Sequence, residues 1–355
     1  MSSPWIAAHI FYYAGADGLL KECVTPLVEE ARAKGLIRRF FFIRYWENGP
    51  HTRLRLLPEK PEDEAILKAL VEERCKEYFQ RRPAMFQFNV EEQAPRYRSM
   101  YEMEYGKEAY LAKYGDNPMP FYPSNSVQYL SYEPEMERYA GLDGLEFSEK
   151  HFEVSSRLVL ETVRNCNLHV RPVLFGNSFQ FVMLMSYGAW ETDARVRDFL
   201  EGYINMWTGF MSKGLRPQES LDLYDRKYKG LAPKLTRRVQ HIRAVASGEA
   251  QATPIERAWY EHGKELRAGI QELWDQGKLV VPEESRTLDG AMAYLLRSYV
   301  HMTNNRLGTT IQDEIYLSQL GQRALETIAA EAAGTALTPQ TETVATGEPN
   351  GQPIA

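Results

Sequence analysis

The stretch "RRFFFIRYWENGPHTRLRLLP", residues 38–58, predicts a β-hairpin. Its first half is aromatic and β-branched, which is typical of a strand, and the ENGP that follows carries Asn-Gly, a strong signal for a hairpin turn. The second strand, 51–57, places His51, Arg53 and Arg55 at every second position. Because side chains alternate between the two faces of a strand, these three share one face beside an apolar one.

Two interpretations of this basic face stay open from the hairpin alone. Like charges on alternate residues repel one another, so either the face is solvated or paired with an acidic helix such as 61–74, or it binds an anion. Arginine suits the second role because its planar guanidinium binds a carboxylate through two parallel hydrogen bonds.

The chain around the hairpin predicts more of a sheet and its helices. Residues 5–14 and the start of 127–141 are expected to be strands, and 17–35 and 61–80 to be helices. The region 92–126, rich in Tyr, Met and Pro, is expected to be a long irregular loop, and such loops are often functional.

From Ser148, a good helix N-cap, the pattern becomes helical and stays so. The expected helices are 148–165, 177–189, 193–213, 219–247, 253–276, 286–307 and 311–331. The sequence therefore predicts an α+β fold, with a mainly antiparallel N-terminal sheet and flanking helices followed by a helix-rich C-terminal half. We expect one domain, 1–331, and a disordered tail, 332–355, because the tail is poor in hydrophobic residues.

Composition excludes several classes of function. The net charge of −6 argues against a general nucleic-acid or anionic-membrane binder. Three widely spaced cysteines argue against a disulfide scaffold or a cysteine-rich metal site. No apolar run is long enough to span a membrane, and no signal peptide is recognisable, so we expect a cytoplasmic protein. No phosphate-binding, dinucleotide or metalloprotease motif occurs, and we expect neither metal nor cofactor.

The segment "YLLRSYVHMTNNRLG", 294–308, predicts a helix with one unusual histidine. His301 falls opposite the apolar stripe of this helix, with Asn304 and Asn305 at helical reach, while Arg306 falls back onto the stripe and needs a partner. His301 is either a solvated residue or a proton-transfer group oriented by the two amides.

Three stretches in series resemble the C-terminal module of lantibiotic dehydratases, which also occurs as stand-alone thiopeptide-type bacteriocin biosynthesis proteins. They are "FFFIRYWENGPHTRLRL" (40–56), "YEPEMERYAG" (132–141) and "SYVHMTNNRLG" (298–308), and the likeness runs from Trp5 to Ala330. The resemblance implies action on a ribosomally made precursor peptide. In the family, a separate module glutamylates Ser or Thr with glutamyl-tRNA, and this module eliminates glutamate to leave dehydroalanine or dehydrobutyrine.

The resemblance also implies roles for single residues. The last arginine of the His-x-Arg-x-Arg strand is Arg55, the arginine of the Arg-Tyr-Gly-Gly motif is Arg138, and the histidine of the His-Met-x-x-Asn-Arg motif is His301. These three are expected to be catalytic, and the expected substrate-binding residues are His51, Arg53, Tyr139, Asn305 and Arg306. Ala140 departs from the family, which has glycine there, and this puts the positioning of Arg138 in doubt.

The implied partners are the precursor peptide and a separate glutamyl-tRNA-dependent glutamylating protein, with no direct nucleic-acid or membrane contact; a homodimer is compatible with the sequence. Two other functions stay open. Stand-alone relatives join two dehydroalanines by a formal [4+2] cycloaddition to make a pyridine, and a non-catalytic scaffold would only present the peptide. Retention of Arg55, Arg138 and His301 favours elimination.

Overall fold

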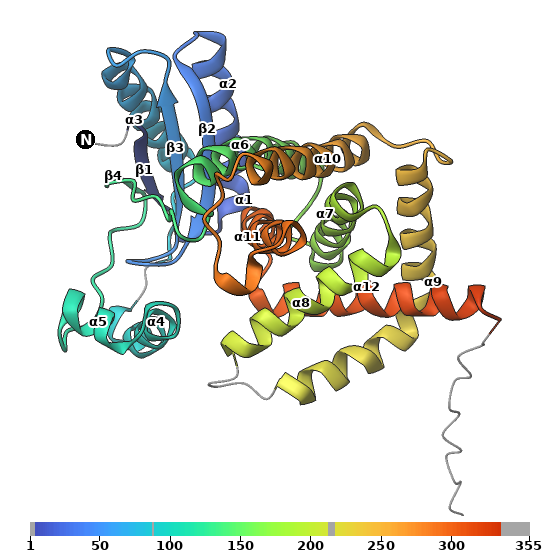
Figure 1. The fold of residues 1–355 in the computed structure, drawn as a ribbon. Helices are drawn as coiled ribbons and strands as arrows, with labels where there is room; N and C mark the ends of the chain where they lie inside the picture. The colour runs from blue at the N-terminus through green and yellow to red at the C-terminus, as the bar shows by residue number, and fades with distance from the viewer. Residues whose placement is uncertain (1–3, 87–88, 212–216, 335–355) are drawn as a thin grey trace, which may run out of the picture.

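A computed structural model of the chain describes residues 4–86, 89–211 and 217–334. Its N-terminal part holds an antiparallel sheet of four strands, in the order β2-β3-β1-β4 (Figure 1). The strands are β1 (Ile6–Phe11), β2 (Ile37–Tyr45), β3 (His51–Pro58) and β4 (Ser126–Tyr129). β3 lies between β1 and β2 and is antiparallel to both, so the helix between β1 and β2 makes a split β-α-β connection. The predicted α+β class and the hairpin are confirmed.

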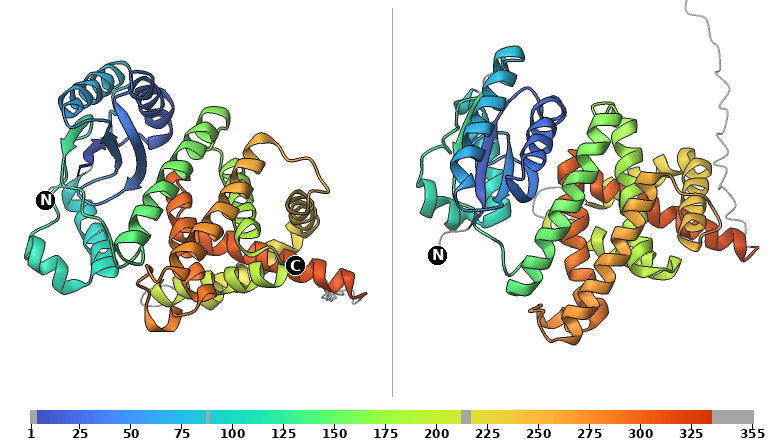
Figure 2. Two further views of the ribbon diagram at one scale, coloured as in Figure 1. Left: turned by 45° about the horizontal axis from the view of Figure 1, so that its top comes forward. Right: turned by 90° about the horizontal axis from the view of Figure 1, so that it is seen from above.

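The two faces of the sheet differ as the hairpin sequence predicts. One face is apolar and carries buried residues such as Phe40, Phe42, Leu54 and Leu56. Helices α2 (Thr25–Ala33) and α3 (Asp63–Arg81) cover this face (Figure 2), and α2 continues from α1 (Ala16–Leu19) through a π-helical turn, Leu20–Val24. The other face carries the basic residues of β3.

The expected loop at 92–126 is wrong over most of its length. The structure has two helices there, α4 (Val90–Tyr105) and α5 (Lys107–Tyr114), which lie apart from the other helices (Figure 1). Tyr97, Tyr101, Tyr110 and Met119 form a small buried cluster of their own. Tyrosines four residues apart lie on one helix face. The tyrosines that suggested a loop therefore form an aromatic core between the two helices.

The C-terminal half contains seven long helices in the described residues, near the ranges that the sequence predicts. They are α6 (Gly141–Asn165), α7 (Arg171–Trp190), α8 (Asp193–Met211), α9 (Pro217–Ser247), α10 (Pro254–Asp275), α11 (Leu288–Leu307) and α12 (Ile311–Ala332), with a 3₁₀ turn at Glu283–Ser285. Ser148 is not an N-cap: it lies inside α6, where its hydroxyl donates to the Gly144 carbonyl at 2.6 Å. Of the expected disordered tail, residues 335–355 lie outside the described residues.

Two helices fasten the helical half to the outer edge of β2. The Phe42 N–H donates to the Ser156 hydroxyl of α6 at 3.1 Å. The Asn305 side chain of α11 accepts from the Arg44 N–H at 2.9 Å and donates to the Arg44 carbonyl at 2.8 Å. These bonds replace the neighbouring strand that β2 lacks on this side, so they close an otherwise open sheet edge.

Candidate functional site

Four basic or imidazole side chains meet on the polar face of the sheet, and we call them the sheet-face cluster: His9, His51, Arg53 and Arg55. His9 of β1 pairs with Arg53 of β3 in the ladder, and the rings of His9 and His51 are stacked with centroids 4.9 Å apart. The Arg55 side chain is buried, with 4% of the residue exposed, and its guanidinium lies 5.5 Å from the Tyr132 ring centroid.

Hydrogen bonding in the sheet-face cluster is incomplete. Arg55 Nη1 and both ring nitrogens of His9 are buried and have no hydrogen-bond partner among the residues that the structure describes. Burial, reinforced by Arg53, lowers the pKa of Arg55 to about 9. Burial and the neighbouring Arg55 lower the pKa of His9, and burial lowers that of His51 to about 3. Near pH 7 the two histidines are therefore neutral, while Arg55 keeps its charge.

Arg53 differs from Arg55 because it has a carboxylate neighbour. Its Nη2 lies 3.5 Å from Glu47 Oε2, and its guanidinium stacks 3.4 Å from the Tyr45 ring centroid. The Arg53 Nε also donates to His51 Nε2 at 3.3 Å, while His51 Nδ1 is 2.7 Å from the Gly49 carbonyl. The His51 proton therefore belongs on Nδ1, and this side chain is fixed in place.

A second group lies among the helices, and we call it the helical cluster: Tyr203 and Trp207 of α8, His301 of α11 and Glu314 of α12. His301 Nδ1 lies 3.1 and 3.2 Å from the two Glu314 carboxylate oxygens. The Tyr203 hydroxyl donates to the same carboxylate, and the Trp207 ring packs 4.8 Å from the His301 ring. His301 is thus not oriented by Asn304 and Asn305, as the sequence suggested, but by a carboxylate from another helix.

Arg138 stands just before α6, next to Tyr139 in the chain. Its side chain is 33% exposed, and Nη1 is 3.3 Å from Glu135. Burial raises the pKa of Tyr203, with Glu314 acting the same way and Arg138 opposing it, so Arg138 is within electrostatic reach of the helical cluster. Burial opposes the charge on Arg138, but neighbouring groups that include Glu104 of α4 raise its pKa. The Tyr45 hydroxyl, whose ring lies against Arg53, is 3.5 Å from the same Glu104 carboxylate.

The backbone after Arg138 explains the glycine that the family prefers. Ala140 adopts the left-handed conformation, with φ of 60° and ψ of 40°, and Gly141 follows with φ of 90°. An L-residue with a Cβ is strained there by about 1–2 kcal/mol. The Tyr294 hydroxyl donates to the Glu137 carbonyl at 2.9 Å and holds the turn against α11.

Of the other three sequence-predicted residues, Tyr139 and Arg306 lie in the protein interior and Asn305 is half-buried. Tyr139 is 3% exposed and packs edge-on against Phe152 at 4.9 Å. Arg306 is fully buried, where its Nε donates to Ser156 and its Nη1 to the Met302 carbonyl. Asn305 and the Arg306 carbonyl both bind Arg44 of β2, so they belong to the contact between the sheet and the helices.

Sequence reasoning missed His9, Tyr203 and Glu314. His9 stands in an expected strand and alternates with apolar residues, which is a usable signal once its pairing with β3 is known. Tyr203 and Glu314 come from separate helices, 111 residues apart, so no local pattern joins them.

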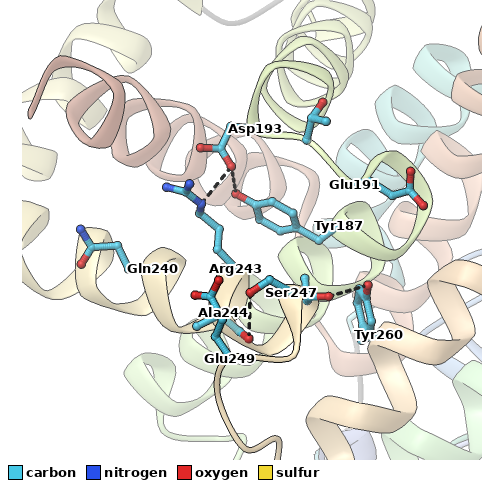
Figure 3. A pocket seen from close by; sticks show the side chains of 11 residues that line it. Tyr187, Glu191, Asp193, Gln240, Arg243, Ala244, Ser247, Glu249 and Tyr260 are labelled. Carbon is cyan, nitrogen blue, oxygen red and sulfur yellow. Dashed lines mark hydrogen bonds and ion pairs between the residues drawn. The ribbon is translucent and has the colours of Figure 1, made fainter. Parts of the chain in front are cut away.

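An open pocket lies elsewhere, between the ends of α7, α9 and α10 (Figure 3). It encloses about 650 Å³ and includes none of the expected site residues. Its polar groups are paired with each other: Asp193 accepts from the Tyr187 hydroxyl at 2.7 Å and lies 3.3 Å from Arg243 Nε.

Residues 4–86, 89–211 and 217–334 hold neither a metal-binding group nor a membrane-spanning helix. No group of three or more His, Cys, Asp or Glu side chains is placed to hold a metal ion. No helix in the same ranges has the length and apolar character that crossing a membrane requires.

Comparison with known proteins decides the family. The family model for the lantibiotic biosynthesis dehydratase C-terminal region matches residues 5–325. The chain belongs to the lantibiotic dehydratase C-terminal family. No curated protein sequence matches it. This family supports a role in the biosynthesis of ribosomally made, post-translationally modified peptides.

Solved structures share the fold of this lantibiotic dehydratase C-terminal protein. The pyridine synthase TbtD from thiomuracin biosynthesis is similar at 21% identity and a TM-score of 0.71, over 94% of this chain and 99% of TbtD. TsrL is similar at 16% identity and a TM-score of 0.63, over 93% of this chain and 96% of TsrL. The tRNA-dependent lantibiotic dehydratase MibB from Microbispora sp. 107891 aligns at 18% identity and a TM-score of 0.50, over 93% of this chain but 29% of MibB.

Proposed function

We propose that the protein eliminates glutamate from glutamylated Ser or Thr side chains of a precursor peptide, leaving dehydroalanine or dehydrobutyrine. The observation that carries this proposal is Arg55, a buried guanidinium with an unpaired Nη1 and neutral histidines around it. A buried charge without a partner is costly, and such a cost is retained where function needs it.

A carboxylate is the partner that fits this site best. Its two oxygens match the fork of a guanidinium, and the leaving group of the elimination is itself a carboxylate. As the Cβ–O bond breaks, negative charge collects on that carboxylate. Arg55, with Arg53 beside it, would stabilise this charge in a water-poor setting where such interactions are strong. Arg138, which is partly exposed, would hold the other carboxylate of the glutamyl group.

His301 supplies the proton transfer in this proposal. Its Nε2 takes the proton from the peptide Cα, the C–H electron pair forms the Cα=Cβ bond, and the Cβ–O electrons leave with glutamate. A carboxylate leaving group needs no proton from the protein. The ring is held by Glu314 and Trp207, so its Nε2 can be presented without reorientation.

Glutamylation would come from a separate partner that uses glutamyl-tRNA. This chain carries the motif residues of the glutamate-eliminating module, Arg55, Arg138 and His301. Its net charge of −6 agrees with a protein that handles a peptide and not the tRNA itself.

The test is to incubate the purified chain with a precursor peptide that carries a glutamylated threonine and to follow the peptide mass. Loss of glutamate with formation of dehydrobutyrine supports elimination. An unchanged glutamylated peptide, with a folded protein and the authentic leader sequence present, contradicts it.

Pyridine formation by [4+2] cycloaddition is the second candidate, because the chain and the pyridine synthase TbtD align over nearly their whole lengths. Its substrate is a peptide with preformed dehydroalanines. Conversion of such a peptide to a pyridine product, without action on the glutamylated peptide, would favour this candidate over elimination.

A further inference from the structure

Three helices each contribute one polar side chain to a buried contact. These are Tyr203 from α8, His301 from α11 and Glu314 from α12. The Glu314 side chain is 0% exposed and the His301 side chain 17% exposed. Among the described residues, the hydrogen-bond partners of the Glu314 carboxylate are the Tyr203 hydroxyl and His301 Nδ1, and no lysine or arginine forms an ion pair with it.

This geometry dictates where the His301 proton lies. An ionised carboxylate can only accept hydrogen bonds, so a close contact with Nδ1 requires the hydrogen to be on Nδ1. The neutral ring then carries a free electron pair on Nε2. The Tyr203 hydroxyl donates to Oε2 of the same carboxylate and helps to hold it beside the ring. Trp207 packs against the imidazole at 4.8 Å and restricts its rotation.

We infer that Glu314 is a positioning residue, which fixes His301 in the tautomer with Nε2 free and stabilises the imidazolium that forms when Nε2 takes a proton. Tyr203 serves the same end by holding Glu314. The catalytic part of this inference rests on the proposed proton transfer by His301. The tautomer does not depend on that proposal and can be measured on the protein without substrate.

The alternative is that the three side chains only tie α8, α11 and α12 together. Both accounts expect some loss of stability when the contact is broken, so stability does not separate them. The two accounts predict different tautomers of His301 and different rates of glutamate loss when Glu314 is replaced. Glu314→Gln separates them well, because glutamine keeps the shape and removes the negative charge.

The first measurement is ¹⁵N NMR of the histidine side chains, with the His301 signals assigned by comparison with His301→Asn. In the wild-type protein we expect the His301 ring with Nδ1 protonated and Nε2 unprotonated. In Glu314→Gln we expect a mixture of tautomers. A wild-type ring protonated on Nε2, or a tautomer that Glu314→Gln leaves unchanged, would overturn the inference.

The second measurement is the single-turnover rate of glutamate loss. Glu314→Gln should lower it on the order of 10- to 100-fold, and Glu314→Asp should retain more activity because the charge remains. The rate of Tyr203→Phe should lie between the rates of these variants and that of the wild type. The matched control is Glu326→Gln on the same helix, whose carboxylate is 35% exposed and bound to Arg323; its rate should equal that of the wild type.

The two measurements separate the failure of this inference from that of the proposed function. A wild-type protein that holds the expected tautomer but does not release glutamate refutes elimination and leaves the role of Glu314 in positioning the ring. A wild-type protein that releases glutamate while Glu314→Gln does so at the same rate refutes the role of Glu314 in catalysis.

Discussion

Replacing Arg55 by methionine should make the protein more stable and less active. Burial, with a smaller effect of Arg53, lowers the pKa of Arg55 from its ordinary value of 12.5 to about 9. At about 1.4 kcal/mol per pKa unit, this corresponds to about 5 kcal/mol of cost for holding the charged guanidinium in the fold. Methionine removes the charge but also gives up contact with the Tyr132 ring. We therefore expect a smaller gain, about 1–4 kcal/mol in the free energy of unfolding.

The sign of this effect with pH follows from proton linkage. The folded-state pKa of Arg55 lies below its unfolded value, so the cost is fully present at pH values below about 9 and is relieved as pH rises above it. The advantage of Arg55→Met should accordingly be largest near neutral pH and should shrink above pH 9.

The assay is urea unfolding of the wild type and of Arg55→Met at pH 7, with Arg53→Met as the matched control. Arg53 shares the strand face, but it has Glu47 as a neighbour, so its removal should bring no comparable gain. Free glutamate should raise the melting temperature of the wild type and not that of Arg55→Met. A loss of stability in Arg55→Met would refute the view that Arg55 is an unpaired buried charge kept for an anion.

Three further predictions concern single residues. Arg138→Ala should let glutamylated peptide bind but slow glutamate loss at least about tenfold, seen as accumulation of glutamylated peptide by mass spectrometry; a normal rate would remove Arg138 from the site. His301→Ala should leave the fold intact by circular dichroism and lower single-turnover glutamate release roughly 10²- to 10⁴-fold; an unchanged rate would leave only the arginines in the proposed chemistry. Asn305→Ala should cost about 1–3 kcal/mol in urea unfolding, because two Arg44 backbone groups lose their partner; a stability equal to that of the wild type would show that water replaces both bonds.

The sequence was most informative where a local period decides the geometry. The alternation of His51, Arg53 and Arg55 depends only on the pleat of a strand, and the structure has all three on one face, opposite Leu54. The turn at Asn48 and Gly49 lies where the hairpin signal put it, and both residues have positive φ. The helices of the C-terminal half follow from their 3.6-residue period in the same way.

Contacts between distant segments could not be predicted in this way. Asn305 is within helical reach of His301, but its amide closes the edge of β2, 261 residues earlier in the chain. The carboxylate that orients His301 is Glu314 of the next helix, α12. From the sequence alone, Glu314 could equally have been a surface residue. Arg306 fell on the apolar stripe as expected, and its Nη1 binds the Met302 carbonyl one turn earlier in α11, but its other partner, Ser156, depends on how α6 packs.

The expectation of a loop at 92–126 failed because composition was given more weight than spacing. Tyr97 and Tyr101 lie four residues apart, as do Tyr110 and Tyr114, and each pair lies on one helix face. Pro95 lies inside α4, where it removes one backbone hydrogen bond, and the helix continues past it to Tyr105.

The most direct test of the account is glutamate release by the purified wild-type chain from a peptide with an isotopically labelled glutamyl-threonine. The account predicts labelled glutamate and dehydrobutyrine in equal amounts, with the rate falling at least about tenfold in Arg55→Met although that variant is the more stable protein. Release of glutamate at the same rate by Arg55→Met, or no release by the wild type, would contradict it.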